Sequence, residues 1–147
     1  MNEIISTHFR YTPENIEHLQ PNQVFVFGSN KAGFHIGGAA KIALDKFGAE
    51  YGNGEGLQGQ SYALPTLDEN LQKLDKDELV KRFQRFLEIV LVNPKLDFFL
   101  TKVGCGIAGY SIEEVKEIFW RVLKKVEPSR KGIRPRNLYI PKEFDID

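Results

Sequence analysis

The sequence contains a single cysteine and carries no net charge, and each shortage excludes a class of protein. Cys105 has no second cysteine with which to form an internal disulfide, so the composition favours a cytoplasmic location over a secreted one. Lysine and arginine together number 20, as do aspartate and glutamate. The chain therefore has no overall positive field with which to bind a polyanion such as DNA, although a local basic patch is still compatible with this composition.

Long apolar runs are also lacking. Runs such as residues 89–92 are far too short to cross a bilayer, so we expect no membrane partner. No basic stretch is followed by an apolar one at the start of the sequence, so we expect no signal peptide. The histidines His8, His18 and His35 do not have the spacing of metal ligands, and we expect neither a bound metal nor a cofactor.

Hydrophobic residues make up 41% of the 147 residues, which is enough for the core of one domain spanning residues 1–147. Runs of β-branched and aromatic residues predict strands at 23–27, 61–64, 97–103 and 137–140. Apolar residues at helical spacing predict helices at 37–46, 77–92 and 112–126. A further short helix is predicted to begin at Thr12-Pro13-Glu14, with Thr12 as its N-cap.

Strands that alternate with helices predict a mainly parallel sheet with helices on both faces. Ligands of such sheets bind beyond the carboxyl ends of the strands, which here means the segments after Phe27 and Val103. Glycine is concentrated in both segments, and backbone N–H groups in such turns bind phosphate without lysine or arginine. The two loops predict a site for a diphosphate; the alternative is a pair of tight turns that let helices pack closely on the sheet.

A third glycine-rich stretch has a different interpretation. Residues 54–59 match the spacing GxGxxG, but they precede a predicted strand instead of following one and opening a helix. We therefore reject a dinucleotide-binding fingerprint, and the absence of a Gly-Lys-Ser/Thr ending excludes a phosphate-binding loop of the kinase or ATPase type. Residues 49–60 are predicted to form a loop, with 52–59 a mobile part of the surface.

The two ligand-loop candidates resemble those of the macrodomain family. The run from Val24 to Asn30, followed by Gly37-Gly38-Ala39-Ala40, resembles the first macrodomain loop, and Val103 to Tyr110 resembles the second. The Gly-Cys-Gly sequence is most similar to the branch that includes the terminal ADP-ribose glycohydrolase. The resemblance implies a three-layer α/β/α fold with a mixed, mostly parallel central sheet. It also implies that the chain binds ADP-ribose, free or attached to a protein or nucleic acid.

The resemblance implies a role for each matching position. Asn30 would lie near the distal ribose, and its amide is able both to donate to and to accept from ribose hydroxyls; the alternative is a turn or capping residue. The implied ligand-binding residues of the first loop are Gly28, Ser29, Asn30, Gly37, Gly38 and Ala39. Those of the second loop are Gly104, Cys105, Gly106, Ile107, Ala108, Gly109 and Tyr110.

Catalysis is less clearly indicated. The resembled hydrolase branch has a catalytic lysine where this chain has Pro65-Thr66-Leu67, and a catalytic aspartate where it has Ala108. Both losses argue against a lysine–aspartate mechanism. An ADP-ribosyl hydrolase that uses Asn30 and a ligand-activated water, assisted by His35, is the alternative function. The competing interpretation of His35 is a loop histidine bonded to the backbone. Lys31, next to Asn30, is a candidate to pair with a phosphate, and its competing interpretation is a solvated lysine.

Two further sequence features concern partners and the base of the ligand. Many macrodomains recognise adenine through an aspartate that the region near Arg10-Tyr11-Thr12 lacks, which leaves Phe9 or Tyr11 to stack on a base. Residues 124–136 are rich in lysine and arginine, and a second alternative is a nucleic-acid or protein interaction module with a vestigial pocket. No aromatic residue lies among these charges, which favours a solvated loop.

Overall fold

The computed structural model describes residues 5–6, 8–126 and 134–146. The strands are β1 (Ile5–Ser6), β2 (Arg10–Tyr11), β3 (Gln23–Asn30), β4 (Gly56–Gln58), β5 (Ser61–Leu67), β6 (Asp97–Leu100), β7 (Arg134–Pro135) and β8 (Leu138–Ile140). The helices are α1 (Gly38–Lys46), α2 (Lys76–Val92), α3 (Ile112–Val126) and the short 3₁₀ helix η1 (Lys142–Phe144). No helix among these residues is long and apolar enough to cross a membrane.

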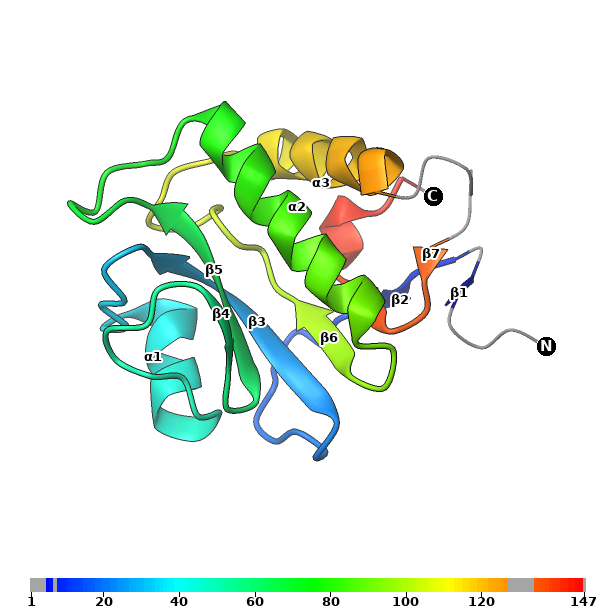
Figure 1. The fold of residues 1–147 in the computed structure, drawn as a ribbon, viewed down its shortest axis with the longest axis horizontal. Helices are drawn as coiled ribbons and strands as arrows, with labels where there is room; N and C mark the ends of the chain where they lie inside the picture. Colours follow the sequence, from blue (N-terminus) through cyan, green and yellow to red (C-terminus); the bar gives the residue numbers. More distant parts are fainter. Residues whose placement is uncertain (1–4, 7, 127–133, 147) are drawn as a thin grey trace.

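The central sheet has six strands in the order β2-β8-β6-β3-β5-β4. Only the pair β4–β5 is antiparallel, so the sheet is mixed and mostly parallel. Helices α2 and α3 pack together on one face and α1 on the other, while β1 and β7 form a separate two-stranded sheet (Figure 1). The predicted three-layer α/β/α fold is confirmed.

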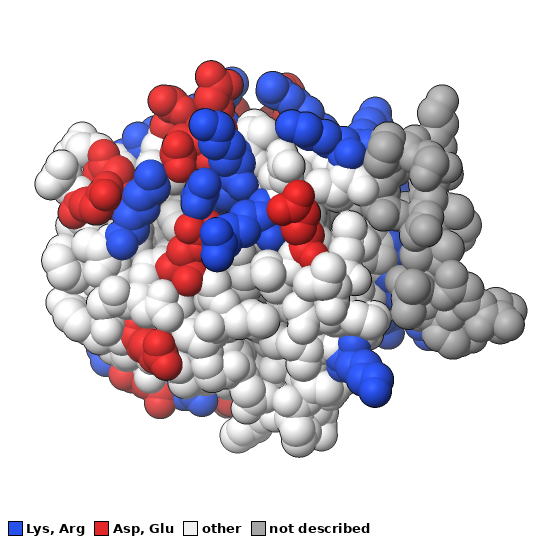
Figure 2. Space-filling model, in the orientation of Figure 1, with Lys and Arg blue, Asp and Glu red and all other residues white. Residues whose placement is uncertain are grey.

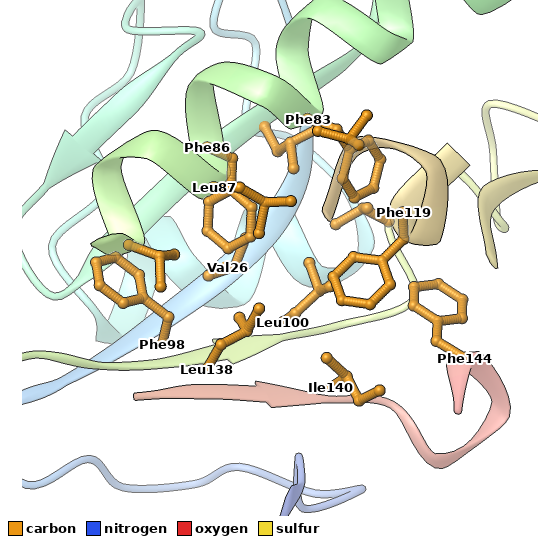
Figure 3. Close-up of a cluster of buried hydrophobic side chains, with 14 of the residues drawn as sticks. Val26, Phe83, Phe86, Leu87, Phe98, Leu100, Phe119, Leu138, Ile140 and Phe144 are labelled. Atoms are coloured by element: carbon orange, nitrogen blue, oxygen red, sulfur yellow. The ribbon is translucent and has the colours of Figure 1, made fainter. Parts of the chain in front are cut away.

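Alternation along β3 explains why helices cover both faces. Val24 and Val26 belong to the core beneath α2 and α3, whereas Phe25 and Phe27 belong to the smaller core beneath α1. Successive side chains of a strand point to opposite faces, so an unbroken apolar run needs cover on both sides. Figure 3 shows the larger core, in which Phe86 of α2 lies among side chains of the central strands. Burial of each such phenylalanine contributes about 1.5–3 kcal/mol.

The short helix predicted at Thr12-Pro13-Glu14 is wrong. This segment is not helical, because Thr12 instead continues from β2 along the neighbouring strands. The backbone N–H of Thr12 donates to the carbonyl of Ile140 (2.8 Å), and its hydroxyl donates to the carbonyl of Leu100 (2.7 Å). Long-range pairing therefore uses the groups that the local pattern assigned to a helix cap.

The loop predicted at 49–60 is also wrong in part. Residues Gly56–Gln58 form β4, an edge strand that pairs with β5, and Gly54 and Gln58 are buried. Pro65 does not end β5, which continues to Leu67. The reason is that the pairing of β5 with β4 stops at Ala63, so no strand lies on that side of Pro65, while Pro65 still pairs with Ser29 of β3 on the other side. The strand predicted at 97–103 is shorter than expected, because β6 ends at Leu100.

Asn137 ties the end of α2 to the sheet. It is buried, and its Nδ2 donates to the carbonyls of Val90 (3.0 Å), Asn93 (2.9 Å) and Leu96 (3.0 Å). We expect Asn137→Ala to lower the free energy of unfolding by about 2 kcal/mol, because buried carbonyls lose their donor. Urea unfolding of the variant measures this, and an unchanged transition midpoint would show that the three bonds contribute nothing.

Candidate ligand-binding site

A cavity of about 500 Å³ opens where β3, β5 and β6 end. Its walls come from the end of β3 and the loop that leads into α1, from Thr66 and Leu67 of β5, and from residues 101–104 and 106–108 after β6. The predicted ligand residues that line it are Gly28, Ser29, Asn30, Gly37, Gly38, Ala39, Gly104, Gly106, Ile107 and Ala108. This is the carboxyl edge of the sheet, where open parallel sheets bind their ligands.

The two predicted loops lie side by side and face this one cavity. A Cβ atom placed on Gly28 would lie 3.4 Å from the backbone nitrogen of Gly104. Farther out, a Cβ atom on Gly37 would lie 4.0 Å from Cδ1 of Ile107. The bend after β3 and the bend after β6 therefore converge, and both line the cavity.

The first wall presents the N-terminus of α1. The N-cap residue, Gly37, has no side chain with which to cap the helix, and the first turn contains no acidic residue. Within the described chain, no hydrogen bond is made by the backbone N–H groups of Gly38, Ala39 and Ala40. All three residues line the cavity, and their free N–H groups carry the partial positive charge of the helix end.

The other two long helices are capped by side chains. Asp75 accepts from the N–H of Glu78 at the start of α2 (2.9 Å). At the start of α3, Ser111 accepts from the N–H of Glu114 (3.1 Å), whose carboxylate in turn accepts from the N–H of Ser111 (2.8 Å). Ser111 and Glu114 thus form a capping box, and this helix end is closed to a ligand.

The second wall presents a row of amides from the loop after β6. Bonds from Cys105 N to Lys102 O (3.2 Å) and from Tyr110 N to Gly104 O (2.8 Å) hold the loop in a sharp bend. Gly104 has φ +78°, and a Cβ there would lie 3.2 Å from the Tyr110 ring, so the bend requires glycine. The N–H groups of residues 106–108 make no hydrogen bond within the described chain. Residues 106–108 line the same cavity as the first residues of α1.

Three predicted ligand residues of this loop do not line the cavity. The Tyr110 side chain is buried in the core against Val115 and its neighbours, because the bend at Gly104 turns the chain back under the sheet. Gly109 lies on the far side of the turn, where its N–H donates to Gly106 O (3.0 Å). Cys105 packs against the larger core. Their predicted contact with the ligand is therefore not supported by the geometry.

Burial also governs the chemistry of Cys105. Its thiol lies 3.6 Å from the carbonyl of Val103, and burial raises the pKa of the thiol above its ordinary value. We expect alkylation at neutral pH to be slower than for an unperturbed thiol, since less thiolate is present, and to accelerate as the pH rises. The rate of Cys105 alkylation, measured across a pH series, tests this. A rate equal to that of a short cysteine peptide would contradict it.

Asn30 lines the cavity, but its amide is partly engaged. Its Oδ1 accepts from the N–H of Phe34 (2.9 Å), and its Nδ2 donates to the carbonyl of Phe34 (3.0 Å). The side chain therefore closes the loop between β3 and α1, as in the turn-residue alternative. One amide hydrogen and one lone pair remain for a ligand hydroxyl.

His35 and Lys31 point elsewhere. His35 is fully buried beside Phe27, its Nε2 lies 3.0 Å from the carbonyl of Asn53, and it does not line the cavity. Lys31 forms an ion pair with Glu78 (3.2 Å). The structure thus agrees with the backbone-bonded interpretation of His35, and it gives no geometry for the general acid or base of the hydrolase alternative.

A scaffold behind the first loop was missed in the sequence. The hydroxyl of Ser29 donates to the carbonyl of Gly54, and the N–H of Gly52 donates to the carbonyl of Gly33 (2.9 Å). Farther out, Glu55 accepts two hydrogen bonds from Arg82 of α2 (2.7 and 2.9 Å). Residues 50–56 therefore hold the ligand loop in place. The closely spaced glycines of residues 52–59 indicated that backbone segments approach each other here. A local sequence pattern does not show which segments these are.

A second cavity of about 280 Å³ adjoins the first, and Thr101 and Lys102 line both. It lies beyond β6 and β8 and is also lined by Glu14 and Asn15. Neither aromatic residue predicted to stack on a base lines either cavity. Phe9 is buried against Phe119 and Trp120 of α3, and the hydroxyl of Tyr11 donates to Asp145 (2.6 Å).

Charge on the remaining surface is mixed. Figure 2 shows basic and acidic side chains interspersed over α2, so that face carries no uniform basic patch. Most of the basic stretch at 124–136, including Arg130 and Lys131, lies outside the described residues. Among the described residues, no group of three histidine, cysteine, aspartate or glutamate side chains is placed to hold a metal ion.

The geometry can now be compared with known proteins. A protein of unknown function shares the fold. It comes from Bacteroides thetaiotaomicron, and its solved structure matches with a TM-score of 0.56 and 13% sequence identity over 85% of this chain and 90% of that chain. At this identity the likeness shows the fold alone. No family model matches the sequence, and no curated protein matches it.

Proposed function

We propose that the chain binds ADP-ribose or a related nucleotide diphosphate, with the pyrophosphate held by backbone amides. The observation that carries the proposal is that residues 38–40 and 106–108 line one cavity, and that their backbone N–H groups have no protein acceptor within the described chain. Amides at a helix N-terminus and in a sharp turn favour phosphate oxygens, because their dipoles point at the ligand and need no reorganisation.

The size and lining of the cavities support a ligand with sugar on either side of the diphosphate. A volume of about 500 Å³ lies within the usual range for small-molecule sites. Asn30 at one end has spare hydrogen-bonding capacity for a ribose, as the resemblance to macrodomains implies. The adjoining cavity, with Glu14 and Asn15 in its lining, has polar groups for the nucleoside end.

Binding is better supported than hydrolysis. Thr66 and Leu67 line the cavity where the resembled hydrolase branch has its lysine, and Ala108 lines it where that branch has its aspartate. His35 is buried away from the cavity. We propose a reader of ADP-ribose, free or linked to a protein or nucleic acid, and the single-cysteine composition supports a cytoplasmic location for it.

Calorimetry with ADP-ribose, AMP and ribose 5-phosphate tests the proposal. ADP-ribose is expected to bind and to raise the melting temperature, since a ligand of the native state stabilises it, while the two fragments bind far more weakly. ADP-ribosylated protein incubated with the chain is expected to keep its label. Equal affinity for AMP and ADP-ribose would contradict a diphosphate site, and release of the label would favour the hydrolase.

A further inference from the structure

The junction of the two cavities contains one charged side chain. Among the described residues that line the first cavity, Lys102 is the only one with a charged side chain, and it also lines the second cavity. The hydroxyl of the neighbouring Thr101 is engaged with β3, where it donates to the carbonyl of Val26 (2.6 Å). A ligand that extends from one cavity into the other therefore passes Lys102, whose ammonium lies beside Glu143 in the lining of the second cavity.

Lys102 is held in place by a weak ion pair. Its Nζ lies 3.4 Å from Oε2 of Glu143, and the two side chains are 51% and 44% exposed. Pairs so exposed contribute little to stability, because water and salt screen them. The pKa of the Glu143 carboxyl is lowered first by its own backbone N–H and to a smaller extent by the Lys102 ammonium.

We propose that Lys102 leaves Glu143 and pairs with the diphosphate when the ligand binds, which makes this pair a selector for anionic ligands. The inference rests on the proposed function and extends it. Backbone amides alone orient phosphate oxygens but add no net charge to the cavity. The Lys102 ammonium would make charge-assisted hydrogen bonds to the diphosphate, and these are stronger than its bond to the half-exposed, solvated carboxylate of Glu143 at 3.4 Å.

Lys102→Gln tests the exchange, with Lys95→Gln as its matched control. Lys95 is exposed in the turn before β6, at the opposite end of the strand that leads to Lys102. By calorimetry, we expect Lys102→Gln to weaken ADP-ribose binding about tenfold at low salt and less at high salt, because screening reduces the lost attraction. Lys95→Gln is expected to match the wild type, and Lys102→Arg to retain most of the affinity.

Glu143→Gln tests the other half of the exchange. With no carboxylate to leave, Lys102 is expected to bind the ligand about threefold more tightly, and the loss caused by Lys102→Gln should be larger in the Glu143→Gln background than in the wild type. If the wild type binds ADP-ribose and Lys102→Gln binds it equally well, the exchange is wrong and the binding site stands. If the wild type does not bind, the proposed function fails and the exchange fails with it.

Discussion

Gly106→Glu is expected to abolish ADP-ribose binding, with a loss of affinity of at least about 100-fold. A Cβ at Gly106 meets no atom within 4 Å, and the residue lines the cavity. The backbone therefore accepts the side chain without strain, and the carboxylate enters the space where the pyrophosphate is proposed to lie. Both bulk and like charge oppose the ligand, and calorimetry with ADP-ribose measures the result.

Gln20→Glu is the control for this variant. It adds the same single charge on an exposed residue that precedes β3, at the end of the sheet away from the cavity. We expect Gln20→Glu to bind like the wild type, and both variants to unfold at the wild-type temperature. A Gly106→Glu protein that is folded and binds ADP-ribose normally would exclude the diphosphate from this loop.

Gly54→Ala is expected to destabilise the protein by about 3 kcal/mol, because it overpacks the scaffold behind the ligand loop. A Cβ on Gly54 would collide with the backbone carbonyl oxygen of Asn30 and would lie 2.7 Å from that of Lys31. Both contacts are with backbone atoms, which cannot rotate away as a side chain does. The end of β3 would have to move, so ADP-ribose affinity should fall as well.

The same glycine-to-alanine substitution at Gly106 is the control for the stability measurement. Gly106→Ala puts the same methyl group into open space, and its unfolding midpoint in urea should stay close to that of the wild type. If Gly54→Ala unfolded at the wild-type urea concentration, residues 50–56 would not be the rigid support that the hydrogen bonds indicate.

Periodicity predicted the parts of this fold that local patterns control. The apolar spacing of 77–92 and 112–126 and the unbroken run at 24–27 correspond to α2, α3 and β3. The rule that parallel sheets bind ligands at their carboxyl ends then brought the segments after Phe27 and Val103 to one edge. The shared cavity between them confirms that the two bends converge.

Features decided by long-range contacts were not predicted. Thr12 satisfies its hydrogen bonds on β6 and β8, which no local pattern shows. The sequence left His35 with two interpretations, and the enclosure of its ring by Phe27 and Asn53, which agrees with the backbone-bonded one, could not be seen in it. Tyr110 was included with the ligand loop, although the bend at Gly104 turns its side chain into the core. In each case a partner distant in sequence determines which way the group points.

An amide NMR titration with ADP-ribose tests the central claim most directly, since it observes the proposed ligands themselves. The account predicts that the N–H resonances of residues 38–40 and 106–108 shift most and together, at one ligand concentration, because one pyrophosphate contacts both rows. Large shifts confined to one row, or centred on residues remote from the cavity, would contradict it.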